Sequence, residues 1–176
     1  MGAATTTSRV PDPRFLVSHP AHFIALGFGS GLLRPAPGTW GTLFAIALYW
    51  ALALFLTPLA IAIVAIPLFF VGIWACDVTG RDIGVADHGS MVWDEIVAFL
   101  PLAALATVYP TDAPTRFRAV YLQVIAFLLF RIFDVWKPFP VRNVERRLKG
   151  GLGVMADDVL AAIYAALVFL VVAWLV

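Results

Sequence analysis

Five long apolar runs are the feature that most limits what this chain can fold into. They are separated by short polar or proline- and glycine-containing segments, and they occupy residues 41–56, 59–76, 92–109, 119–136 and 159–176. A bilayer has no water to satisfy backbone groups, so apolar segments of about 20 residues cross it as helices. The sequence is 62% hydrophobic and 13% charged, whereas a soluble domain is about 45–50% apolar and about 25% charged. We therefore predict an all-α integral membrane protein with about five transmembrane helices.

The N-terminal region is predicted to lie outside these spans. Residues 1–20 are polar and contain three prolines, which favours a disordered or surface arm, and residues 21–176 then form a single transmembrane domain. Residues 22–33 are apolar but short, and at about 1.5 Å per residue they cannot cross a hydrocarbon core of about 30 Å. We predict an interfacial or re-entrant segment here. After it, Thr39 is placed to cap the first long helix.

Charged residues divide unequally between the two faces that alternating spans create. Ten of the twelve Lys and Arg residues fall on one face, and only Arg116 and Arg118 fall on the other. By the positive-inside rule, the crowded face is predicted to be cytoplasmic. The acidic residues divide 10 to 1 in the same direction, although membrane orientation does not require this. The net charge of +1 gives no indication of a nucleic-acid partner.

The acidic residues on the crowded face cluster at the ends of three predicted spans. Asp94 and Glu95 open the run 92–109, Asp134 lies near the end of 119–136, and Asp157 and Asp158 stand at the start of 159–176. Because these ends lie at one depth, the carboxylates can share a site. Mg²⁺ prefers carboxylate oxygens, retained waters and substrate phosphate. We therefore predict a Mg²⁺ site built by Asp94, Glu95, Asp134, Asp157 and Asp158.

Helix capping is the alternative explanation for most of these acids. Negative charge is favourable in the first turn of a helix, where Asp94, Glu95, Asp157 and Asp158 are expected. Asp134 does not fit this explanation, because it is predicted near the C-terminal end of a helix, where the dipole disfavours a carboxylate. A structural scaffold, in which the acids only cap helices, is therefore one competing hypothesis.

Two cations lie close to these acids in the sequence. Arg131 supplies a guanidinium fork and Lys137 a point charge, both suited to phosphate. Alternatively, Arg131 and Asp134 simply pair, since they are three residues apart on a helix. The remaining cations of the loop are expected to contact anionic lipid; they are Arg142, Arg146, Arg147 and Lys149. The chain has no cysteine, aspartate or paired-histidine phosphatase motif, so a metal-activated water attacking a phosphate monoester is the predicted chemistry.

Four stretches make the sequence resemble the phosphatidylglycerophosphatase A family. They are GFGSGLLRPAPGTWGT (27–42), MVWDEIVAF (91–99), FLLFRIFDVWKPFP (127–140) and GGLGVMADDVLA (150–161). The resemblance implies a Mg²⁺-dependent enzyme of the bacterial inner membrane, with its active site facing the cytoplasm. Its substrate would be phosphatidylglycerol phosphate in the membrane, and its lipid product phosphatidylglycerol.

The family's functional roles fall on positions that match its motifs. The resemblance implies catalytic roles for Asp94, Glu95, Asp134 and Asp158, and it implies that Arg131 and Lys137 bind the phosphate. Thr39 is implied to line the phosphate pocket. Two further functions compete with this one: a transporter or ion carrier that uses carboxylates, and another lipid-phosphate enzyme such as a phosphotransferase.

Overall fold

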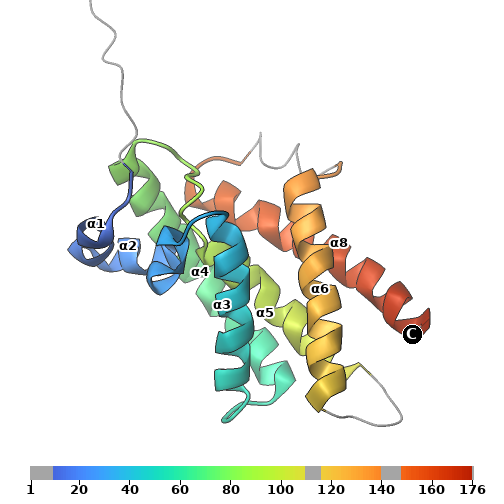
Figure 1. Cartoon of the computed structure of the whole chain (residues 1–176). Helices are drawn as coiled ribbons and strands as arrows, with labels where there is room; N and C mark the ends of the chain where they lie inside the picture. The colour runs from blue at the N-terminus through green and yellow to red at the C-terminus, as the bar shows by residue number, and fades with distance from the viewer. Residues whose placement is uncertain (1–9, 110–115, 140–147, 176) are drawn as a thin grey trace, which may run out of the picture.

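The computed structural model describes residues 10–109, 116–139 and 148–175. All regular secondary structure in these ranges is helical, which confirms the predicted all-α class. The helices, shown in Figure 1, are α1 (Pro13–Ser18), α2 (Pro20–Ala25), the 3-10 helix η1 (Gly27–Leu32), α3 (Pro37–Leu52), α4 (Pro58–Ile83), α5 (Trp93–Val108), α6 (Arg116–Trp136) and α8 (Gly150–Leu175).

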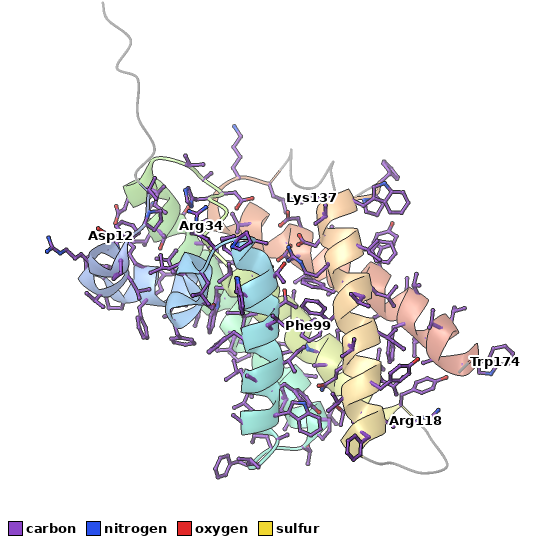
Figure 2. All side chains as sticks on the ribbon, viewed as in Figure 1. Asp12, Arg34, Phe99, Arg118, Lys137 and Trp174 are labelled. Carbon is purple, nitrogen blue, oxygen red and sulfur yellow. The ribbon has the colours of Figure 1, made fainter. Side chains whose placement is uncertain are left out.

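Helix α5 is the centre of the bundle. It packs against α3, α4, α6 and α8 (Figure 1). All five consecutive residues from Ile96 to Leu100 are buried, and successive residues of a helix point about 100° apart, so this stretch of α5 is covered on every side. Phe99, labelled in Figure 2, packs against Phe130 of α6 with ring centroids 5.7 Å apart. The first turn of α5 is consequently held at a fixed position among the surrounding helices.

Three helices are long and apolar enough to cross a membrane. They comprise Pro58–Ile83 of α4, Phe117–Trp136 of α6 and Gly150–Trp174 of α8. Helices α3 and α5 coincide with two further predicted spans, but each has 16 residues, or about 24 Å at 1.5 Å per residue. That length is shorter than a hydrocarbon core of about 30 Å. The described helices therefore confirm a membrane-type bundle with three candidate spans.

Two predicted helix starts were wrong. Helix α3 begins at Pro37, and its N-cap is Ala36 without a side-chain hydrogen bond, so Thr39 lies inside the first turn and does not cap it. Helix α8 begins at Gly150, well before the predicted start at residue 159. Gly151 permits this early start, because a Cβ there would lie 1.9 Å from the carbonyl oxygen of Ile73. Helices α8 and α4 consequently pack with their backbones close together.

The N-terminal region packs against the bundle. Residues 13–18 of the predicted arm form α1, which buries Phe15 against Leu26 and Ile83. The predicted interfacial or re-entrant segment forms most of α2 together with η1, and α2 lies against α4. His22 of α2 is buried and its Nε2 lies 2.9 Å from Asp82 Oδ2 of α4. These contacts hold the N-terminal helices beside one end of α4 (Figure 1).

Candidate metal and phosphate site

Three buried carboxylates meet where α5 faces α8. Asp94 and Glu95 come from the first turn of α5, and Asp158 comes from α8. One oxygen from each of the three lies within 4.8 Å of the others. Asp94 is only 7% exposed and Asp158 only 3%. We call Asp94, Glu95 and Asp158 the carboxylate cluster.

The position of Asp158 is inconsistent with helix capping. Since α8 begins at Gly150, Asp158 lies about two turns inside the helix, whereas the favourable effect of the helix dipole is limited to the first turn. Asp94 and Glu95 do lie in the first turn of α5, but the N-cap residue there is Val92 and no side chain caps the helix. Helix capping therefore leaves the burial of Asp158 unexplained.

One oxygen of each cluster carboxylate is buried without a hydrogen-bond partner among the described residues. These atoms are Asp94 Oδ1, Glu95 Oε2 and Asp158 Oδ2. A buried carboxylate needs a compensating partner, and neighbouring carboxylates repel each other. A divalent cation with oxygen ligands would relieve both problems, and Mg²⁺ characteristically binds one or two carboxylates plus phosphate. The cluster therefore fits a small divalent cation.

Arg131 of α6 borders the carboxylate cluster, and its guanidinium group lies against one of the cluster acids. Its NH1 lies 2.6 Å from Asp134 Oδ2 and 3.6 Å from Glu95 Oε1. The predicted pairing of Arg131 with Asp134 is thus confirmed, and the same guanidinium also reaches Glu95. The arginine side chain remains 20% exposed. A guanidinium in this position can contact a bound phosphate while its carboxylate neighbours hold its orientation.

Asp134 and Asp157 flank the cluster and each faces a cation. Asp134 is paired with Arg131 and also lies close enough to Asp158 to interact with it. Asp157 forms an ion pair with Lys137, the residue that follows α6. Both predicted phosphate-binding cations therefore pair with carboxylates near the C-terminal end of α6. Figure 2 shows Lys137 at the end of this helix opposite Arg118.

Helix α3 closes the site on a further side, through a glycine that the sequence analysis did not single out. A Cβ on Gly38 would lie 2.1 Å from Glu95 Oε1 and 3.0 Å from Arg131 NH1, so any side chain there would collide with this pair. The signal in the sequence was the Pro-Gly-Thr start of the helix. Thr39 is half-buried beside Gly38, and among the described residues its hydroxyl has no hydrogen-bond partner.

Four further cations were predicted between the end of α6 and the start of α8. Arg142, Arg146 and Arg147, which were predicted to contact anionic lipid, lie outside the described residues. Lys149 is described and is exposed just before α8. The polar end of α4 has its own ion pair, in which Arg81 NH1 lies 3.0 Å from Asp77 Oδ2; the Arg81 side chain is 68% exposed and that of Asp77 41%. Asp77 and Arg81 therefore form a surface pair, as a solvated helix end does.

Comparison with known proteins identifies relatives over nearly the whole chain. The family model for phosphatidylglycerophosphatase A matches residues 23–173. The phosphatidylglycerophosphatase A of Haemophilus influenzae is 42% identical over 163 residues, which cover 92% of this chain and 94% of that protein. The protein of the same name from Escherichia coli K12 is 40% identical over 158 residues, covering 89% of this chain and 86% of that protein.

A third relative carries another name. This protein, from Bacteroides thetaiotaomicron, is provisionally named a phosphatidylinositol-3-phosphatase. It is 39% identical over 159 residues, which cover 87% of this chain and 93% of that protein. No solved structure matches the chain. All three named relatives are thus named for removing a phosphate from a lipid headgroup.

Proposed function

The chain belongs to the phosphatidylglycerophosphatase A family, and from this premise we propose that it hydrolyses the terminal phosphate monoester of phosphatidylglycerol phosphate. The lipid product is phosphatidylglycerol, and inorganic phosphate is released. The single observation that carries the proposal is the carboxylate cluster, in which three buried acids each keep an oxygen that no described residue contacts by a hydrogen bond. A scaffold has no need of such unpaired charge in its interior.

Mg²⁺ is the proposed cofactor, held by Asp94, Glu95 and Asp158. Asp134 and Asp157 flank these ligands. Each is paired with a cation, so together they add no net charge beside the metal site. When bound, Mg²⁺ supplies Lewis acidity toward the phosphate ester and toward the attacking water. The mutual distance of 4.8 Å or less between the ligand oxygens supports a single shared cation.

Arg131 and Lys137 are proposed to bind the phosphate oxygens. Arg131 is oriented by Asp134 and Glu95, so its planar fork is ordered before the substrate arrives. Positive groups aimed at the oxygens stabilise the charge that develops during phosphoryl transfer. Lys137 adds a point charge from the exposed end of α6, and Thr39 would line the same pocket beside Gly38.

The site is proposed to face the cytoplasm from the bacterial inner membrane. Arg34 and Lys137 lie toward one end of the bundle, and Arg118 lies at the other (Figure 2). This distribution supports the orientation expected from the positive-inside rule. We propose that α3 and α5 complete five spans, with local thinning of the bilayer compensating for their short length.

Phosphate release from purified protein in detergent tests the assignment. The substrates are phosphatidylglycerol phosphate, phosphatidic acid and phosphatidylinositol 3-phosphate, each with Mg²⁺, with EDTA, and with EDTA followed by excess Mg²⁺. We expect selective hydrolysis of phosphatidylglycerol phosphate that is lost in EDTA and restored by Mg²⁺. Preference for phosphatidylinositol 3-phosphate would instead give this chain the activity for which the Bacteroides relative is named. Turnover unaffected by EDTA would refute the metal site.

A further inference from the structure

An apolar groove runs between α4, α5 and α8 and has a volume of about 520 Å³. All the residues that line it are apolar. Five of the lining residues are alanines, whose small side chains leave the space open: Ala62 and Ala65 on α4, Ala98 on α5, and Ala162 and Ala166 on α8. The large side chains at its rim, Ile66, Phe70 and Ile163, are 59%, 63% and 50% exposed. The groove therefore opens on the apolar outer surface of two candidate membrane spans.

The groove begins one helical turn from the carboxylate cluster. Ala98 follows Asp94 by four residues on α5, and Ala162 follows Asp158 by four residues on α8. Residues four apart in a helix lie on the same face, one above the other. The same two helix faces therefore present carboxylates at one level and a hollow apolar surface at the next.

The groove extends along the helices rather than across them. On α5 its lining residues run from Val97 to Leu105, and on α4 they run from Ala62 to Phe70. At a rise of about 1.5 Å per residue, each of these stretches is about 12 Å long. A wholly apolar groove of this length that opens toward lipid matches an extended hydrocarbon chain. It offers no polar side chain that would recognise a soluble ligand.

We propose that the groove binds one acyl chain of the lipid substrate while its phosphate occupies the carboxylate cluster. This inference rests on the proposed function and adds a second substrate-binding site to it. Bilayer lipid is as apolar as the groove, so moving a chain from one to the other yields little affinity. The benefit is orientation: a chain held along α5 and α8 keeps the phosphate ester in register with the site, and positioning of this kind acts on kcat/KM.

Filling the groove tests this assignment. Ala166→Phe places a ring two turns beyond Asp158, which avoids direct disturbance of the cluster. The quantity to measure is the ratio of kcat/KM for phosphatidylglycerol phosphate with two 16-carbon chains to kcat/KM for the same headgroup with two 4-carbon chains. We expect Ala166→Phe to lower this ratio about tenfold or more, because only the long chain reaches the filled region.

Ala47→Phe is the matched control. It makes the same substitution at an exposed alanine of α3, which does not line the groove, and the ratio should stay at the wild-type value. A ratio within twofold of wild type in Ala166→Phe would overturn the groove assignment while leaving the proposed function intact. Failure of wild-type protein to hydrolyse either lipid would overturn both.

A second measurement uses unmodified protein and does not depend on the variant folding. A non-hydrolysable phosphonate analogue of phosphatidylglycerol phosphate, with a diazirine near the end of one acyl chain, is photolysed with the protein in phosphatidylethanolamine vesicles. Labelling of groove residues on α4, α5 or α8, competed by unlabelled analogue, supports the assignment. If excess unlabelled analogue does not reduce the labelling of the groove, the groove holds any bulk lipid chain. If two protein copies become cross-linked at Ile66 or Phe70, the groove is a dimer contact. Either result overturns the assignment.

Discussion

Two buried polar regions lie at different levels of the same apolar bundle, and they differ in one respect. Gln123 of α6 is 1% exposed; its Oε1 accepts a hydrogen bond from Trp50 Nε1 at 2.8 Å, and its Nε2 donates to Thr107 Oγ1 at 3.1 Å. Every polar atom of this amide has a protein partner. The carboxylate cluster instead keeps three oxygens without a partner among the described residues.

The comparison separates a structural polar group from one prepared for a ligand. We call the hydrogen-bonded side chains of Gln123, Trp50 and Thr107 the Gln123 network. It connects α3, α5 and α6, and its members provide hydrogen-bond partners for one another. A buried network of this kind contributes to a unique packing arrangement. Buried carboxylates that repel each other and lack partners destabilise the fold unless something else binds them. The cluster is therefore the proposed functional region, and the Gln123 network has only a structural role to explain it.

The largest expected effect is on activity, from removing one cluster charge. Asp158→Asn should lower kcat for phosphatidylglycerol phosphate by at least about 10³-fold, as loss of an essential catalytic group does. Its melting temperature without Mg²⁺ should not fall, because the substitution removes one of three mutually repelling carboxylates. Phosphate release measures kcat, and thermal unfolding measures the melting temperature. A variant that keeps a tenth of the activity would show that Asp158 belongs with the structural region.

A smaller loss is expected from Arg131→Lys, which keeps the charge but removes the guanidinium fork. Activity should fall about 10²-fold, as it does when a donor to the developing charge is lost. Arg118→Lys, at the opposite end of α6, is the matched control and should behave like wild type in the same assay. Equal activity in Arg131→Lys and wild type would mean that Arg131 serves only to pair Asp134 and Glu95.

Mg²⁺ should stabilise the protein through the cluster alone. At about 100 times its dissociation constant, a ligand that binds only the folded state adds about 2.7 kcal/mol to the free energy of unfolding. We expect Mg²⁺ to raise the melting temperature of the wild-type protein and of Gln123→Leu, and to raise that of Asp158→Asn much less. Equal stabilisation of all three proteins would place the cation elsewhere.

The smallest expected effect is that of Gln123→Leu, which should alter stability and leave activity within about threefold of wild type. Trp50 Nε1 and Thr107 Oγ1 lose a partner, and a buried hydrogen bond in a membrane bundle is worth about 0.5–2 kcal/mol. Denaturant-dependent unfolding in detergent measures the change. A loss of activity comparable to that of Asp158→Asn would break the distinction between the two regions.

Much of the architecture was predictable because apolar runs and helix signals are local. Each of the five predicted runs overlaps one helix, namely α3, α4, α5, α6 or α8, although α8 begins before its run and α4 ends after its own. Thr57 caps α4 by accepting from Ala60 N, and Gly84 ends it with φ 85°. The errors lie where packing overrides local preference. Glycine has a low helix propensity, yet Gly151 lies inside α8 because only a residue without a side chain allows this close approach to α4.

An apolar helical bundle with acids and cations near its helix ends could be predicted from the residues alone. Which of those acids share a site depends on how the helices pack. Asp157 and Asp158 are neighbours in the sequence, yet Asp158 joins Asp94 and Glu95 while Asp157 pairs with Lys137. The physical reason is that successive side chains of a helix point about 100° apart, so the packing of α8 against α5 and α6 assigns each carboxylate to a different neighbour.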